Sequence, residues 1–347
     1  MSLLDSYKFF KWDEARKRFL PEWWRRAIVP NWLTIEGVDQ TLPVTVAAAG
    51  SLTKPMSFRQ PYGSAEGLDH NLGQPFIGKY FLFCDSTDTT AASQISVKLR
   101  DVGMSREFSN RPIHIRNLAG TAQLPFRLRE PVWFPSDHNI SAEFNKLSGG
   151  AAKIRFYMFG STMYAYDPIL KQYPEERAKL YDLIKKFNNR SRYIQPYFLT
   201  TDVSDVSVTD QGTGTYYAKC GDDGCVELFG ITAVSNKEFS VEINEVETRT
   251  TLHNGAITQT NGCGSGTLPF KFPTSYLLPA GARLKMVFTD IGTAGSNLSV
   301  YFCLYGRKIY APIKEAKEAI RDLVVPVLAD ERSPMIPPAM TGMRGYR

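Results

Sequence analysis

Histidine is scarce in this chain, and the spacings that mark catalytic or metal sites are absent from its sequence. Only His70, His114, His138 and His253 occur among 347 residues. The sequence contains no phosphate-binding loop, dinucleotide fingerprint or zinc-protease motif. The nearest match to a nucleophile motif, Gly262-Cys-Gly-Ser-Gly266, has cysteine where the nucleophilic serine would stand. The sequence therefore predicts a protein that is not an enzyme and that holds no cofactor or metal.

The five cysteines are an odd number in a long chain, which argues against a disulfide scaffold. Cys220 and Cys225 flank a Gly-Asp-Asp-Gly turn, where a hairpin would bring them within disulfide range. A structural zinc site usually takes four ligands, and only Cys263 could join this pair. Two alternatives remain for Cys220 and Cys225: a disulfide between them, or a loop in which both are free thiols.

Long apolar runs and a strong excess of one charge are also missing. No run approaches the roughly 18 residues that cross a bilayer, and the N-terminus lacks the apolar stretch of a secretory signal. The 41 Lys and Arg residues against 35 Asp and Glu give a net charge of +6, which is mild for a nucleic-acid-binding protein. Hydrophobic residues make up 43% of the chain and aromatic residues 12%. This composition predicts a folded protein of two domains.

An internal repeat is the most informative feature of the sequence. Residues 95–102 match residues 239–246, and 124–126 match 268–270, both at an offset of 144 positions (95 to 239). Apolar and polar residues alternate in the longer pair, as in half-buried strands. We therefore predict a mainly β protein with two tandem antiparallel β-sandwich domains, jelly-roll-like, which arose from an internal duplication and carry short flanking helices.

Helical patterns flank both repeats. Pro174 and two glutamates open a segment with apolar residues at helical spacing, and a similar pattern runs from Ile313 to Val325. Each sandwich is expected to begin with a similar five-residue sequence, residues 30–34 (Pro-Asn-Trp-Leu-Thr) in the first and 196–200 (Pro-Tyr-Phe-Leu-Thr) in the second. The predicted organisation is a helical aromatic and basic arm (1–29), a first sandwich (30–168), a connecting helix (169–194), a second sandwich (195–312), and a C-terminal helix with a tail (313–347).

Basic and aromatic residues interleave most densely in residues 7–26. Asp13 is expected to cap a short helix through Phe19, and Pro21 to open another. Such an arm fits a membrane surface, a nucleic-acid backbone, or packing against a β domain or a neighbouring subunit. We expect the last of these, because buried aromatic residues and arginine dominate interface energetics. The candidate assembly-interface residues are Phe19, Trp23, Trp24, Arg25 and Arg26.

The stretches 268–281 (with Leu-Pro-Phe and Leu-Leu-Pro) and 300–311 (closing with Tyr-Gly-Arg-Lys-Ile-Tyr-Ala) resemble structural proteins of bacteriophage virions. The resemblance implies an oligomeric β-sandwich component of the head, collar or tail, located in the virion and assembled in the host cytoplasm. The implied partners are further copies of the chain, other virion proteins, and a possible membrane or nucleic acid at the arm. The tandem arrangement also resembles the double jelly-roll major capsid proteins of membrane-containing viruses, although here helices lie between and after the β units.

The sequence therefore favours a non-enzymatic structural component of a virus particle, such as a capsid, decoration or collar protein. A double jelly-roll major capsid protein is one alternative. A carbohydrate-binding or adhesin module is another, since jelly rolls are common lectin scaffolds, and an exposed aromatic platform would favour it. The segment 338–346 is expected to dock on a neighbouring molecule, because a free chain end would otherwise be poorly ordered.

Overall fold

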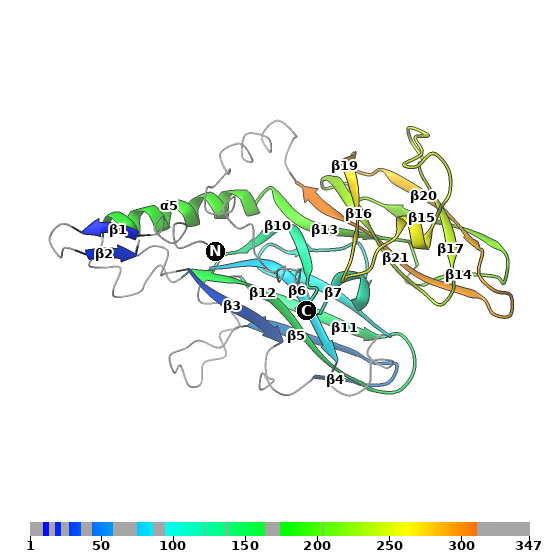
Figure 1. Ribbon diagram of the computed structural model, residues 1–347, viewed down its shortest axis with the longest axis horizontal. Coiled ribbons are helices and arrows are strands. Elements are labelled where there is room, and N and C mark those ends of the chain that lie inside the picture. The colour runs from blue at the N-terminus through cyan, green and yellow to red at the C-terminus, as the bar shows by residue number, and fades with distance from the viewer. Residues whose placement is uncertain are drawn as a thin grey trace, which may run out of the picture.

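Two β-sandwiches lie side by side, and a long helix follows the first of them in the chain (Figure 1). The computed structural model describes residues 10–13, 18–21, 28–35, 44–57, 75–85, 94–121, 123–136, 138–163, 174–203 and 205–310. The predicted fold class is confirmed, because antiparallel sheets dominate these residues and the helices are few. No helix in these ranges is long and apolar enough to span a bilayer.

The first sandwich consists of two sheets with the strand orders β10-β6-β12-β3 and β5-β11-β7, with β4 on β12 and with β8 and β9 on β7. A short pairing of β3 with β5, at Thr34 and Ile35, joins the sheets along one edge. The strands are β3 (Ile28–Ile35), β4 (Val44–Val46), β5 (Ser51–Ser57), β6 (Phe76–Asp85), β7 (Ile95–Asp101), β8 (Arg106–Glu107), β9 (Ile113–His114), β10 (Phe126–Phe134), β11 (Ile140–Lys146) and β12 (Ala152–Met163).

The second sandwich repeats this arrangement. Its sheets have the orders β13-β21-β16-β19, with β14 on β21, and β15-β20-β17-β18. The strands are β13 (Ile194–Thr200), β14 (Val206–Val208), β15 (Thr213–Lys219), β16 (Cys225–Ser235), β17 (Phe239–Glu245), β18 (Ile257–Thr258), β19 (Phe270–Leu278), β20 (Arg283–Asp290) and β21 (Leu298–Ile309). In both sandwiches four strands form one sheet in the equivalent order, β3-β12-β6-β10 in the first and β13-β21-β16-β19 in the second, which is the jelly-roll arrangement.

Both sandwiches also share an irregularity in their longest strands. The ladder between β12 and β6 shifts register at Gly160, and the ladder between β21 and β16 shifts opposite Gly306. A Cβ atom on Gly160 would lie 1.8 Å from the Ile77 carbonyl oxygen, and one on Gly306 would lie 2.0 Å from the Glu227 carbonyl oxygen. Only glycine permits this close approach, so the bulge explains why the repeat keeps glycine at both positions.

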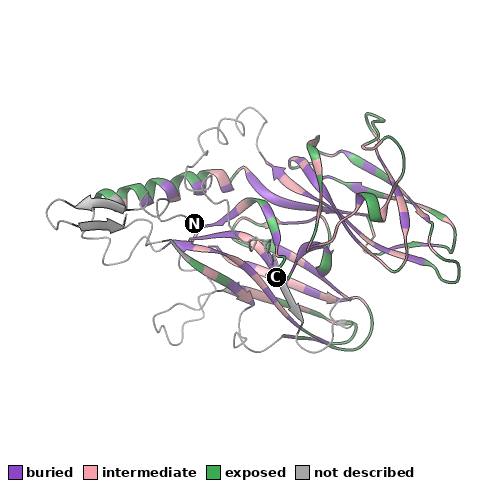
Figure 2. Cartoon of the chain, in the orientation of Figure 1, coloured by how far each residue is buried: buried purple, intermediate pink, exposed green. Residues whose placement is uncertain are grey.

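Alternating burial along the strands forms the two cores. In β17, Phe239, Val241 and Ile243 are buried while the residues between them are partly exposed. The same alternation runs along β11 and β20, and Figure 2 shows it as changing colours along the strands. This period of two is the pattern expected for strands with one face on a core.

The predicted connecting helix is observed as α5 (Pro174–Ser191). Its buried residues Leu180, Leu183 and Phe187 follow helical spacing and face β10. The ring of Phe187 stacks on Trp133 of β10 with centroids 5.0 Å apart, and the indole N–H of Trp133 donates to the Asn188 side chain. Two one-turn helices, α4 (Ile115–Leu118) and α6 (Gln259–Gly262), occupy equivalent places in the two sandwiches.

The helix predicted from Asp13 to Phe19 is wrong. The structure has an antiparallel hairpin there, in which β1 (Phe10–Asp13) pairs with β2 (Arg18–Pro21). Phenylalanine and tryptophan favour strands, and two such runs with a short connection satisfy each other's backbone, which the capping signal of Asp13 does not outweigh. The second arm helix, predicted from Pro21, is wrong at both ends, because Pro21 ends β2 and Ile28 begins β3, while residues 22–27 lie outside the described residues. The C-terminal helix and tail also lie outside the described residues.

Candidate assembly interface

The first sandwich covers part of the outer face of the second, in a contact that we call the junction. Phe198 of β13 is 1% exposed, and its ring lies 5.7 Å from that of Phe126 and 6.4 Å from that of Phe81. Tyr305 of β21 meets Phe126 edge-on at 5.5 Å, and Cys303 is buried beside it. These side chains of the second sandwich belong to the core of the first. The two domains are therefore packed through a continuous apolar contact.

Backbone hydrogen bonds fix the register of the junction. The Phe198 N–H donates to the Phe108 carbonyl at 2.8 Å, which forms a parallel bridge on the free edge of β13. The Asn110 side chain makes two hydrogen bonds to the Thr200 backbone. Its Nδ2 donates to the Thr200 carbonyl and its Oδ1 accepts from the Thr200 N–H, both at 2.8 Å. A partly buried amide that makes paired bonds of this kind orients one domain on the other.

Helix α4 supplies a second set of polar contacts. Asn117 is 1% exposed, and its side-chain Nδ2 donates to the Tyr301 carbonyl at 2.7 Å. The backbone carbonyl of Asn117 accepts from the Thr232 hydroxyl at 3.2 Å. The Gly266 N–H donates to the Arg116 carbonyl at 2.6 Å. A Cβ atom on Gly266 would lie 2.5 Å from that carbonyl oxygen, so the domains meet at backbone contact distance there.

An aromatic cluster occupies the equivalent sheet face of the first sandwich, and we call it the aromatic face. Trp32 of β3 lies 4.3 Å from Phe159 and 6.1 Å from Tyr157, and Phe159 stacks on Tyr80 at 6.0 Å. Trp32 is 44% exposed, and the other three rings are half-buried. The exposed Trp32 ring, set in this aromatic cluster, is therefore a candidate contact site.

The end of the second sandwich that carries α6 is also partly uncovered, and we call it the open end. Leu252, Ile257 and Cys263 are partly buried against the core, Phe270 is partly exposed, and Asn261 is exposed. In the first sandwich, the positions that correspond to Leu252, Asn261 and Phe270 are Phe108, Asn117 and Phe126. All three are buried, and the side chains of Asn117 and Phe126 contact the second sandwich. The open end thus exposes residues whose counterparts in the first sandwich are buried.

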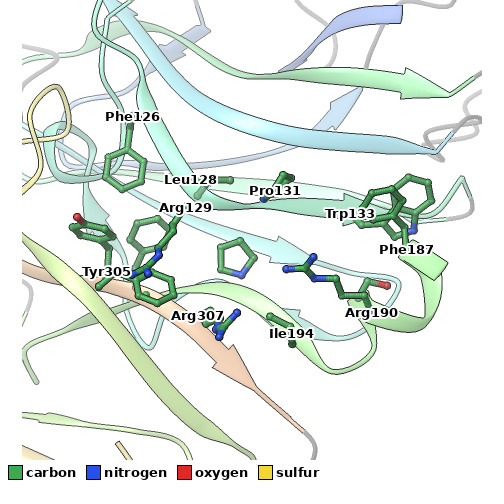
Figure 3. Close-up of a pocket in the computed structure, with 15 residues that line it drawn as sticks. Phe126, Leu128, Arg129, Pro131, Trp133, Phe187, Arg190, Ile194, Tyr305 and Arg307 are labelled. Atoms are coloured by element: carbon green, nitrogen blue, oxygen red, sulfur yellow. The ribbon is translucent and has the colours of Figure 1, made fainter. Parts of the chain in front are cut away.

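A recess lies where β10, α5 and the second sandwich meet (Figure 3). Arg129, Arg190 and Arg307 rim it, and aromatic rings form its walls. Arg129 lies over the Phe229 ring at 4.4 Å, and Arg307 is ion-paired with Glu227 at 2.6 Å. The described residues that line the recess include no histidine, cysteine or carboxylate, so it offers no acid–base pair. Of these arginines, Arg129 crosses the junction, because it lies on β10 of the first sandwich and stacks on Phe229 of β16 in the second.

The candidate disulfide is not formed, because Cys220 and Cys225 are both free thiols in the structure. Cys220 belongs to the core of the second sandwich, where burial raises its pKa to about 12, and burial likewise raises the pKa of Cys263 to about 12. Thiols held in the protonated form are poor nucleophiles and poor metal ligands. In the described part of the chain, no three His, Cys, Asp or Glu side chains are grouped so as to hold a metal ion.

One ionic cluster fastens the loops at the far end of the second sandwich. The Lys237 ammonium donates to Asp210 at 2.7 Å, to Asp290 at 2.8 Å and to the Ser296 carbonyl at 2.6 Å. The hydrogen bond from Lys237 lowers the pKa of both carboxyls and raises the pKa of Lys237 itself. Because the ion pair stays charged and the ammonium joins the turn at Asp210, the end of β20 at Asp290 and the loop at Ser296, the cluster is structural.

The assembly residues predicted from the arm are not among the contacts described above. Phe19 lies in β2, but its side chain and residues 22–27, with Trp23, Trp24, Arg25 and Arg26, are outside the described part of the structure. Sequence reasoning did not identify Trp32 and Phe198 as contact residues. They lie in the two similar five-residue sequences at residues 30–34 and 196–200. The signal was present as a large aromatic residue at the same place in both sequences.

The fold and junction together define a class of protein: a tandem jelly-roll chain whose domains contact each other through an aromatic sheet face. No protein-family model and no curated protein matches it. Among solved structures, it is similar to the VP2 subviral particle of infectious bursal disease virus (12% identity, 82% of this chain and 71% of that chain, TM-score 0.21). It is also similar to the CUB1-EGF-CUB2 domains of rat MASP-1 (9% identity, 80% and 97%, TM-score 0.19) and to the coconut allergen cocosin (8%, 84% and 93%, 0.16). None of these similarities assigns the chain to a family or a function.

Proposed function

We propose that this chain is a non-enzymatic structural component of a virus particle, with a bacteriophage as the expected source. Copies of the chain assemble through their β-domain surfaces and terminal arms as a capsid, decoration or collar protein. The observation that carries the proposal is the junction: the chain already packs one jelly roll on another through an aromatic sheet face, and it exposes a second such face at Trp32. Jelly rolls are frequent in capsid proteins, and exposed aromatic patches mark sites of association.

The repeated topology supports an origin by internal duplication. Strands β7, β9 and β10 precede β17, β18 and β19 by 144 residues (95 to 239, 113 to 257, 126 to 270), and both sandwiches keep the glycine bulge. A duplicated jelly roll with an internal contact is also what the alternative, a double jelly-roll major capsid protein, requires. In either case the implied partners are further copies and other virion proteins, and the implied location is the virion.

Carbohydrate binding is the second candidate function, and the aromatic face favours it. Trp32 is 44% exposed and is flanked by Asn31, whose side chain donates to the Thr162 hydroxyl at 2.9 Å, so rings and polar groups lie together. Exposed indole rings can stack on sugars, and jelly rolls serve as lectin scaffolds.

Two measurements on the purified full chain test these functions. Light scattering coupled to size exclusion, with negative-stain electron microscopy of the same fractions, is expected to show regular multi-chain assemblies whose mass is a multiple of 39.0 kDa. Glycan-array binding is expected to be absent. A chain that stays at the single-chain mass at every concentration and binds a defined glycan would overturn the structural role and support the lectin function.

A further inference from the structure

We propose that a second copy of this chain docks the open end of its second sandwich on the aromatic face, in a contact equivalent to the junction within one chain. This contact rests on the assembly function proposed above and names the surfaces that perform it. The aromatic face consists of Trp32, Tyr80, Tyr157 and Phe159. The open end consists of Leu252, Ile257, Asn261, Cys263 and Phe270.

Strand register shows that Trp32 and Phe198 hold the same place. Trp32 pairs with Phe159 across β3 and β12, and Phe198 pairs with Tyr305 across β13 and β21. In each case, the next residue on the longer strand is the bulge glycine. The first sandwich reduces the exposure of Phe198 to 1% and of Tyr305 to 6%, whereas Trp32 is 44% exposed. Within the described residues, the chain therefore shows what covers this sheet position in one domain, while Trp32 at the equivalent position keeps 44% of its surface exposed.

The covering surface is duplicated as well. Phe126, which lies 5.7 Å from Phe198, pairs with Phe81 on β6, and its counterpart Phe270 pairs with Ile231 on β16. Asn117 is 1% exposed in the junction, while its counterpart Asn261 on α6 is exposed. Each chain thus carries one surface to be covered and one covering surface. Because Trp32 on one surface and Asn261 on the other are both exposed within one chain, a contact between them requires a second copy.

One difference limits the equivalence. Strand β3 pairs with β5 at Thr34, whereas the equivalent edge of β13 is held by Asn110 at Thr200. The docked copy therefore contacts the aromatic face by ring packing, with Phe270 on Trp32 and Phe159, and makes no amide clamp. A contact between two different surfaces is heterologous, so it builds a closed ring or an open chain of copies.

Complementary variants of the full chain test the contact. Trp32→Arg disrupts the aromatic face, and Asn261→Arg places a bulky charge on the open end at a position that is exposed in one chain. Tyr217→Arg is the matched control, because Tyr217 is 41% exposed on β15 and belongs to neither surface. The mass of each variant is measured by light scattering at matched concentration, and circular dichroism melts confirm that each is folded.

Each of the two interface variants is expected to fall in mass relative to the wild type, while the Tyr217→Arg control keeps the wild-type mass. An equal mixture of the two is expected to regain a two-chain species of about twice 39.0 kDa, because one intact aromatic face meets one intact open end. If the wild type assembles and neither substitution changes its mass, or if the mixture regains nothing, this contact is wrong and the assembly function stands. If the wild type has the single-chain mass at every concentration, both are wrong, and a glycan that binds only with Trp32 intact identifies the other occupant.

Discussion

Removal of the Phe198 ring should destabilise the protein much more than removal of the Trp32 ring, although the two residues hold the same place in two copies of one fold. Phe198 is 1% exposed and lies between Phe81 and Phe126. Truncation of such a residue to alanine leaves a cavity and costs about 3–5 kcal/mol. Trp32 is 44% exposed, so Trp32→Ala loses only about half of the burial energy of a large side chain, roughly 1 kcal/mol.

Urea unfolding followed by far-ultraviolet circular dichroism measures this difference. Both substitutions are made in the Asn261→Arg background, which removes the proposed contact between copies and leaves only the contacts within one chain. We expect Phe198→Ala to lower the free energy of unfolding by at least about 2 kcal/mol more than Trp32→Ala does. Equal losses for the two variants would refute the reasoning, because they would mean that the first sandwich does not cover Phe198 in solution.

Three further changes probe the junction and the ionic cluster. Gly266→Val is expected to separate the domains, because backbone lies within contact distance of any side chain there, and small-angle scattering should record a larger radius of gyration; an unchanged radius contradicts this. Asn110→Ala is expected to cost about 1–3 kcal/mol in thermal or urea unfolding, since the Thr200 N–H and carbonyl lose their partner, and a loss below about 0.5 kcal/mol contradicts the clamp. The hydrogen bond from Lys237 lowers the pKa of Asp290, so its stabilising effect is complete above about pH 4 and is lost as the pH falls further. Lys237→Met should flatten the stability profile in that acid range, and an unaltered profile would show that the pair contributes nothing.

The repeat could be predicted from the sequence because it fixes local patterns. The alternating apolar residues at 95–102 and 239–246 form β7 and β17, and the two Leu-Pro-Phe sequences lie at the starts of β10 and β19. The connecting helix was also predictable, since proline opens α5 and its apolar residues recur at helical spacing. In each case the signal lies within one element and its neighbours along the chain.

The junction could not be predicted in the same way. The sequences at residues 30–34 and 196–200 are similar, yet Phe198 is buried and Trp32 is exposed. Burial at this position depends on how the two whole sandwiches pack together, which a local sequence does not encode. The hairpin of β1 and β2 was missed for a related reason. Pairing between strands outweighs a helix cap whose contribution is only about 1 kcal/mol.

Electron cryomicroscopy of assemblies of the full chain tests the central claim most directly. The account predicts that the aromatic face of each copy is covered by a neighbouring second sandwich, with Phe270 of the neighbour on Trp32 in the geometry that Phe126 and Phe198 have within one chain. An assembly whose copies meet elsewhere, with Trp32 open to solvent in every copy, would contradict it.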